Sequence, residues 1–209
     1  MIAKCVSLFV AAYLAVAGFN YATTSPEDSS VLIQAVQGRA NGSGVLIGDN
    51  LVLTARHVTE ATRITPLKVT LDGHDFPCKV VAEDDMVDLG LLFCPGVKGP
   101  KAYVGNVAKV GDNVTATGYP LYNMLTSRIT TSGVILKSDP VKYLMTTQLL
   151  PGNSGGGLYK LKWYGRWELV GINVAGMMLP IGFTASFLDN YTVAVNSDFI
   201  KRFLSNNGY

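Results

Sequence analysis

Histidine and cysteine are both scarce in this chain of 209 residues, which holds two His and three Cys. Three Cys cannot supply a four-cysteine zinc site or a disulfide framework for a fold of this size. Any mechanism that needs an imidazole must use His57 or His74, because the sequence has no other. We expect no metal and no cofactor, since neither paired His/Cys ligands nor a phosphate-binding loop before a helix occurs.

Charge is sparse as well. Only 15% of the residues are charged, the formal net charge is +2, and no run of Lys or Arg occurs. A chain of this kind lacks the basic surface that nucleic-acid binding requires, so we expect no nucleic-acid partner. The hydrophobic share of 48% excludes a disordered tail protein and indicates one or two compact domains.

One apolar segment stands apart at the N-terminus. Lys4 precedes residues 5–19, which carry no charge, and Ala15-Val16-Ala17 lies just before Gly18. This pattern predicts a secretory signal peptide over residues 1–17, followed by a polar linker over 18–30. We therefore expect the protein to be exported, to the periplasm or the medium. The alternative is an uncleaved membrane anchor through residues 5–19, although a membrane span needs about 20 apolar residues.

The remaining chain is rich in short β-type segments, which glycines and polar turns separate. They lie at 31–36, 44–47, 51–54, 67–71, 76–82, 89–94, 113–118, 129–136, 141–147, 157–161, 167–174 and 191–195. Many short strands at such spacing predict an all-β barrel or sandwich. Only the end of the chain looks helical, with Ser197 as the cap of a helix over 198–205. The Pro- and Gly-rich segment 95–100 divides the chain into predicted domains at 31–100 and 101–209.

Cys78 and Cys94 lie on consecutive predicted strands that a short acidic loop joins. A hairpin pairing centred near Met86 places them opposite each other, at the Cα separation of a disulfide. An exported protein can form such a bond, so we predict a Cys78–Cys94 disulfide. The alternative is that both remain free as small buried apolar residues.

Ser154 lies in the most specific motif of the chain, Pro-Gly-Asn-Ser-Gly-Gly-Gly at 151–157. Glycines allow a tight turn whose backbone approaches a substrate closely. In a suitable turn, the N–H groups of Gly152 and Ser154 converge on one point and form an oxyanion hole. A flexible Gly/Ser turn without function is the alternative.

A base and an acid for Ser154 are available earlier in the chain. His57 follows the apolar strand 51–54, and Asp88 opens the apolar strand 89–94, where it could bond the imidazole. A structural histidine and a solvated carboxylate are the alternatives. We expect His74 to be inert in an exposed turn, and Asp84 and Asp85 to be solvated.

The order of these residues discriminates between folds. Residues 152–156 also fit the nucleophile-elbow pattern of α/β-hydrolases, in which the catalytic His follows the Ser. No His follows Ser154 in this chain, and alternating strands and helices are absent from the pattern. The sequence therefore excludes that fold.

Four motifs resemble the trypsin/chymotrypsin superfamily of serine proteases, and its bacterial, HtrA-like branch most closely. They are Gly-Ser-Gly-Val at 42–45, Thr-Ala-Arg-His-Val at 54–58, Asp-Leu-Gly-Leu-Leu at 88–92 and Gly-Asn-Ser-Gly-Gly at 152–156. The resemblance covers about residues 30–205. It implies two antiparallel six-stranded β-barrels with the active site between them, and a short C-terminal helix.

The resemblance also implies roles. His57 matches the general base, Asp88 the orienting acid and Ser154 the nucleophile, while Gly152 and Ser154 match the oxyanion-hole donors. We therefore expect a serine endopeptidase that cleaves polypeptides through an acyl-enzyme. The alternative is a catalytically silent binding module on the same fold. The sequence leaves the natural substrate, the source and the oligomeric state open.

Three departures from the family pattern matter. Asn153 stands where digestive members have an Asp that pairs with a newly cut N-terminus, so we expect no activation of that kind. The chain ends at Tyr209, so we expect no PDZ domain. The resemblance places the base of the S1 pocket at Gln148 and its wall at 174–176, which comprises Val174, Ala175 and Gly176. Because Gln148 is neutral, we expect a neutral, small-to-medium P1 residue.

Overall fold

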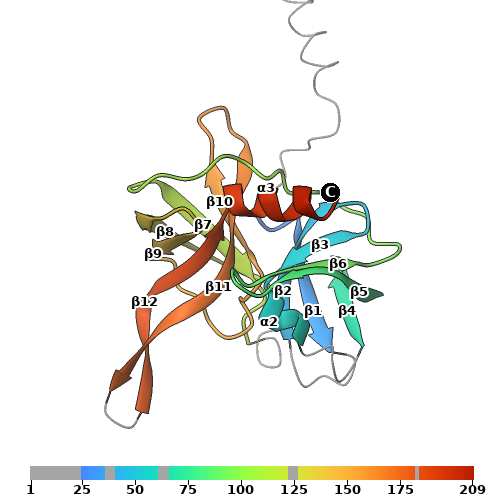
Figure 1. The fold of residues 1–209 in the computed structure, drawn as a ribbon, viewed down its shortest axis with the longest axis horizontal. Helices are drawn as coiled ribbons and strands as arrows, with labels where there is room; N and C mark the ends of the chain where they lie inside the picture. Colours follow the sequence, from blue (N-terminus) through green and yellow to red (C-terminus); the bar gives the residue numbers. More distant parts are fainter. Residues whose placement is uncertain (1–24, 36–40, 61–65, 122–126, 182–183) are drawn as a thin grey trace, which may run out of the picture.

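The computed structural model describes residues 25–35, 41–60, 66–121, 127–181 and 184–209, and these residues form two closed antiparallel β-barrels (Figure 1). The first barrel has the strand order β1-β2-β3-β6-β5-β4. Its strands are β1 (Ser30–Ala35), β2 (Asn41–Gly48), β3 (Leu51–Thr54), β4 (Leu67–Leu71), β5 (His74–Asp84) and β6 (Leu89–Phe93). The expected chymotrypsin-like fold class is confirmed.

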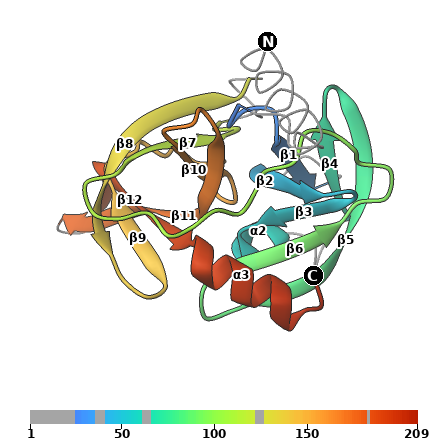
Figure 2. The same cartoon turned by 90° about the horizontal axis from the view of Figure 1, so that it is seen from above.

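The second barrel has the order β10-β11-β12-β9-β8-β7. Its strands are β7 (Asn113–Gly118), β8 (Ile129–Ser138), β9 (Lys142–Met145), β10 (Gly157–Leu161), β11 (Trp167–Ile181) and β12 (Thr184–Asn196). A C-terminal helix, α3 (Ser197–Asn206), follows directly. Figure 2 shows the barrels side by side, with α3 running from the second barrel across the first.

Strands β11 and β12 are longer than the sequence predicts. The expected strands end at Val174 and start at Tyr191, whereas the structure continues the ladder with Met178 opposite Phe187 and Ile181 opposite Thr184. This extension projects from the barrel as a hairpin (Figure 1). Pro180 can be accommodated there because a strand at the edge of a sheet does not need every N–H for pairing.

The helices correct two further expectations. Helix α3 begins at Ser197, and its N-cap is Asn196, whose side chain accepts a hydrogen bond from the Phe199 N–H at 3.0 Å. A second, short helix, α2 (Arg56–Glu60), was not predicted. It is only five residues long, which is too short for a helical period of apolar residues to be recognised in the sequence.

The hydrophobic core extends from the first barrel into the second. One buried cluster combines first-barrel residues such as Leu53 and Leu91 with Tyr159 and Ile172 of the second barrel. Phe203 of α3 belongs to the same cluster. A separate cluster fills the second barrel. The shared core holds the two barrels in one arrangement, because shifting either barrel would expose apolar surface to water.

The segment before β1 is attached to the second barrel. The hydroxyl groups of Ser29 and Tyr159 lie 2.8 Å apart in a buried hydrogen bond, and Thr130 Oγ1 donates to Glu27 Oε1 at 2.8 Å. Burial raises the pKa of the Tyr159 hydroxyl above its usual range. Ser29 and Ser30, which close the predicted linker 18–30, are fully buried.

The predicted signal peptide (1–17) and the alternative anchor (5–19) lie outside the described residues. Among the helices that the structure does describe, none is long and apolar enough to span a membrane.

The predicted disulfide between Cys78 and Cys94 is confirmed. Strands β5 and β6 pair with Lys79 opposite Phe93, so the next pair along the ladder is Cys78 and Cys94. Their Cα atoms lie 4.2 Å apart, closer than the 5.5 Å of a hydrogen-bonded antiparallel pair. The bond closes the loop that leads to Asp88.

We predict that the double substitution Cys78→Ala/Cys94→Ala lowers the free energy of unfolding by about 3 kcal/mol. A disulfide with a sequence separation of 16 restricts the unfolded chain by roughly this amount. Urea unfolding of both proteins measures the difference, and the wild type with reductant should approach the variant. Two free thiols in the native protein, detected by mass spectrometry after alkylation, would contradict the prediction.

Candidate active site

His57 is positioned by the short helix α2 rather than by the end of strand β3. The strand ends at Thr54, and α2 begins two residues later at Arg56. The Arg56 N–H donates to the Asp88 carbonyl at 3.2 Å, which ties the start of α2 to the start of β6. The fold thus brings His57 and Asp88 together although 30 residues separate them in the sequence.

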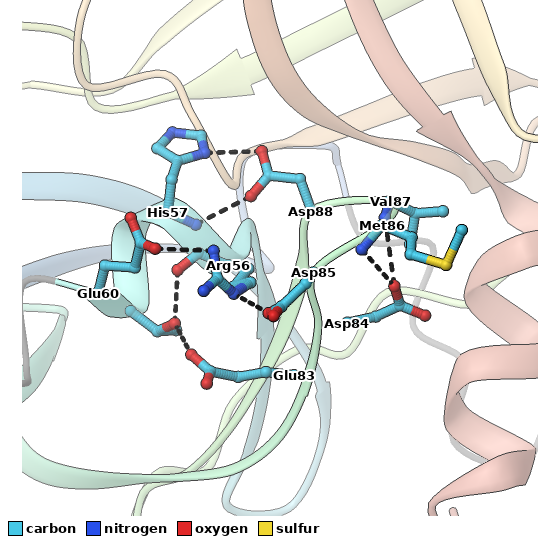
Figure 3. Close-up of polar contacts among 10 residues, drawn as sticks. Arg56, His57, Glu60, Glu83, Asp84, Asp85, Met86, Val87 and Asp88 are labelled. Carbon is cyan, nitrogen blue, oxygen red and sulfur yellow. Dashed lines mark hydrogen bonds and ion pairs between the residues drawn. The ribbon is translucent and has the colours of Figure 1, made fainter.

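The Asp88 carboxylate contacts His57 at two points (Figure 3). His57 Nδ1 lies 2.7 Å from Oδ2, and the His57 backbone N–H donates to Oδ1 at 2.9 Å. Because a carboxylate only accepts hydrogen bonds, Nδ1 carries the hydrogen, which leaves a lone pair on Nε2 when the ring is neutral. Asp88 has a φ of 69°, in the left-handed region that Asp tolerates better than most residues. The pair fixes both the ring orientation and the tautomer.

The turn before Asp88 is held by its own acidic residues, which the sequence analysis expected to be solvated. Asp84 Oδ1 accepts the N–H groups of Met86 and Val87 at 2.9 and 3.2 Å. Asp85 is exposed but forms an ion pair with Arg56, which also contacts Glu60 at 2.7 Å (Figure 3). These contacts join α2 to the turn that presents Asp88.

Ser154 lies in the tight loop between β9 and β10. Gly152 and Gly155 have φ values of 99° and 83°, which side chains rarely adopt. A Cβ on Gly152 would lie 2.6 Å from the Tyr119 carbonyl oxygen, and one on Gly155 would lie 2.2 Å from the Ser43 carbonyl oxygen. Both positions therefore require glycine, as the sequence motif indicates.

The backbone donors of this loop divide into two groups. The N–H groups of Asn153, Gly155 and Gly156 donate to the carbonyls of Leu150, Asn173 and Asn153, at 2.7 to 3.0 Å. In contrast, neither the Gly152 nor the Ser154 N–H donates to any acceptor among the described residues. These are the two donors that the sequence analysis assigned to an oxyanion hole.

A cavity of about 260 Å³ brings the two halves of the site together. It is lined by His57 from α2 and by Gly152 and Ser154 from the loop, with apolar side chains such as Ile33 and Leu67 of the first barrel. No hydrogen bond joins the Ser154 hydroxyl to His57 within the part of the chain that the structure describes. The serine, the imidazole and two unpaired N–H groups thus lie around one space.

Of the residues predicted for the S1 pocket, Gln148 and Val174 are not among the described residues that line this cavity. Gln148 is exposed, and its carbonyl accepts a hydrogen bond from Thr131 Oγ1 at 2.9 Å. Val174 is buried, and Ala175 and Gly176 follow it in β11. Asn173, just before them, exchanges backbone hydrogen bonds with Gly155 and Gly156. Strand β11 therefore lies directly beside the Ser154 loop.

His74 takes no part in this arrangement. It opens β5, is exposed and pairs with Leu71 across the tight turn at Asp72 and Gly73. The described residues contain no group of three His, Cys, Asp or Glu side chains that could hold a metal ion.

Two residues at the site were missed as functional candidates. Ser43 of β2 contacts the Ser154 loop through its backbone and its side chain, and Thr54 Oγ1 donates to the Ser43 carbonyl at 2.7 Å. Ser43 belongs to a motif that the sequence analysis noted, but only the tertiary structure shows what its hydroxyl contacts.

We predict that Gly152→Ala lowers the free energy of unfolding by more than about 2 kcal/mol. Backbone strain at a positive φ costs about 1–3 kcal/mol by itself, and the clash with the Tyr119 carbonyl adds to it. Gly165→Ala is the matched control, because Gly165 has a φ of 81° but no atom within 4 Å of a Cβ. It should cost about 1 kcal/mol, since only strain applies. Thermal unfolding compares the two, and equal losses would contradict the predicted clash.

The chain matches a family model described as a trypsin-like peptidase domain over residues 42–172. It is 25% identical to the glutamyl endopeptidase of Staphylococcus epidermidis, over 86% of this chain and 66% of that protein. It is 31% identical to a probable periplasmic serine endoprotease, DegP-like, of Pseudomonas putida, over 66% of this chain and 29% of that protein. The chain thus spans just under two thirds of the first relative and less than a third of the second.

Among solved structures, the Rv3671c protease of M. tuberculosis in its active form has a TM-score of 0.69 and 21% identity. The match covers 88% of this chain and 82% of that chain. At this identity, the likeness supports the fold alone. The family model covers more than half of the chain, and the chain therefore belongs to the trypsin-like peptidase family.

Proposed function

We propose that the protein is a serine endopeptidase in which Ser154 is the nucleophile, His57 the general base and Asp88 the orienting acid. One observation carries the proposal: His57, which is paired with Asp88 at 2.7 Å, borders the same cavity as Ser154 and Gly152, whose N–H groups are unpaired. Membership of the trypsin-like peptidase family supports the same reaction class.

The proposed reaction follows from the roles that this geometry allows. Ser154 Oγ attacks the peptide carbonyl carbon while His57 Nε2 accepts its proton. The carbonyl oxygen becomes an oxyanion, and the Gly152 and Ser154 N–H groups donate to it. His57 then gives the proton to the leaving amine, which departs and leaves an acyl-enzyme. A water molecule, deprotonated by His57, hydrolyses the ester and restores Ser154.

Asp88 supports this cycle without exchanging a proton. Its carboxylate holds Nδ1–H, so that Nε2 is the free base, and it stabilises the imidazolium that forms after proton transfer. The His57 side chain is 40% exposed and that of Asp88 is 27% exposed, so water reaches the pair in the free protein. A substrate bound over His57 would exclude this water. Their attraction is stronger in such a dry site.

The test compares His57→Ala and Ser154→Ala with the wild type and with His74→Ala as the matched histidine control. We expect kcat to fall by about 10⁶-fold in the first two variants, since members of such a triad act as a unit. His74→Ala should retain activity, because His74 lies in an exposed turn. Hydrolysis of a denatured protein substrate provides the rates.

Labelling by an active-site serine phosphonate separates the proposal from its alternative. The wild type should be labelled and Ser154→Ala should not. A folded wild type that resists labelling and cleaves nothing would instead favour a catalytically silent binding module.

We also propose that the substrate is a polypeptide with a neutral P1 residue. Gln148 at the expected base of the S1 pocket has no charge to pair with Arg or Lys, and the neighbouring Val174 is apolar and buried. A relative is named a glutamyl endopeptidase, so an acidic P1 residue must be included in any comparison.

A peptide series that varies only P1 tests this specificity. We expect kcat/KM for Ala, Val and Gln to exceed that for Arg and Lys by at least about tenfold, since a pocket contact is worth about 1–3 kcal/mol. Fastest cleavage after Arg or Lys would contradict the neutral pocket, and fastest cleavage after Glu would assign the specificity of the staphylococcal relative.

Export is part of the proposal, with residues 1–17 as the signal peptide and the barrels as the mature protein. The Cys78–Cys94 disulfide suits an oxidising compartment outside the cytoplasm. The DegP-like relative is named as periplasmic.

A further inference from the structure

We infer that Ser43 is a positioning residue, whose hydroxyl holds the oxyanion-hole loop in its active geometry. The inference rests on the proposed function and extends it to a residue of the other barrel. Ser43 lies in β2 of the first barrel and is fully buried.

All polar groups of Ser43 have partners at the site. Its N–H donates to the Ser154 carbonyl at 2.8 Å, and its carbonyl accepts from Thr54 Oγ1 at 2.7 Å. Its Oγ–H donates to the Gly152 carbonyl at 2.7 Å, and the same oxygen accepts the Tyr119 N–H at 2.7 Å. The hydroxyl therefore bridges two segments of the second barrel.

The first of these segments is the loop itself. The Gly152 carbonyl belongs to the Gly152–Asn153 peptide, which lies between the peptides that carry the Gly152 and Ser154 N–H groups. The carbonyls on either side are also held, because Pro151 accepts from Leu121 N–H at 2.8 Å and Asn153 accepts from Gly156 N–H at 3.0 Å. With all three carbonyls held, the Gly152 and Ser154 N–H groups remain without acceptors.

The second segment supports the same loop from behind. Residues 119–121 supply the Leu121 N–H that holds Pro151, and the Tyr119 carbonyl oxygen lies 2.6 Å from where a Cβ of Gly152 would be. Ser43 Oγ anchors this segment at the Tyr119 N–H. Loss of the hydroxyl thus removes the hydrogen bond to the Gly152 carbonyl directly. It also weakens the hydrogen bond from Leu121 to Pro151, because residues 119–121 lose their anchor.

Only a hydroxyl suits this position. A serine oxygen offers one hydrogen and acceptor lone pairs, which is what a carbonyl and an N–H require together. Alanine would remove both the donor to the Gly152 carbonyl and the acceptor of the Tyr119 N–H, whereas the thiol of cysteine is a weak donor and acceptor of nearly the same shape. The series Ser, Cys, Ala should therefore weaken the loop in steps.

Kinetics of Ser43→Ala and Ser43→Cys form the first test. We expect kcat to fall by about 10- to 100-fold in Ser43→Ala with KM nearly unchanged, because oxyanion stabilisation acts in the transition state. Ser43→Cys should be intermediate. Ser29→Ala is the matched control: it removes another fully buried hydroxyl that bonds to the second barrel, and it should lower the melting temperature without lowering kcat.

Amide hydrogen exchange is the second test, and it does not depend on activity. In Ser43→Ala, the Asn153 and Gly156 N–H groups, both hydrogen-bonded in the native loop, should exchange at least about tenfold faster than in wild type. The same amides should keep their protection in Ser29→Ala. Should Ser43→Ala not fold, the Ser43→Cys comparison decides the matter by the same two measurements.

The outcomes are distinguishable. Unchanged exchange in the folded Ser43 variants, or an equal fall of kcat in Ser29→Ala, would overturn the inference. A different outcome is that Ser43→Ala exchanges faster while the wild type shows no labelling that depends on Ser154. This outcome would uphold the role of Ser43 in the loop and overturn the proposed function instead.

Discussion

The backbone hydrogen bond from the Ser43 N–H to the Ser154 carbonyl joins the two barrels at the point where the site is assembled. The first barrel supplies His57 and Asp88, and the second supplies Ser154, so the proposed reaction depends on how the barrels dock. A displacement of about 1 Å between reacting groups can cost about 100-fold in rate. A direct bond between β2 and Ser154, the proposed nucleophile, limits this displacement more closely than apolar packing, which has no preferred direction.

Apolar packing nevertheless supplies the stability that this bond requires. Tyr159 and Ile172 of the second barrel share one buried cluster with Leu53 and Leu91 of the first, and Phe203 of α3 extends it. The large buried area keeps water away from the hydrogen bonds between the barrels, which strengthens them. Packing thus holds the barrels together, and the hydrogen bonds select one register among the arrangements that packing alone would allow.

Much of the fold could be predicted because alternation and turn residues are local signals. The strand over 67–71 and the turn at Asp72 and Gly73 agree with the structure to the residue, and the hairpin of Cys78 and Cys94 follows from counting along two strands. Local signals fail where tertiary contacts decide. Residues 174–181 contain no polar side chain, so no polar–apolar alternation reveals the extension of β11 beyond Val174. Likewise, nothing in the sequence around Ser43 shows that its hydroxyl reaches Gly152.

The division of the site between the barrels has a consequence for synthesis. The first barrel is complete once β6 has formed, so His57 and Asp88 can adopt their positions early, as N-terminal units commonly fold first. The second barrel closes only when β12, near the end of the chain, pairs with β9 and β11. Ser154 is therefore held in place only after β12 has been made, so under the proposed function a chain whose synthesis has not reached β12 has no assembled site.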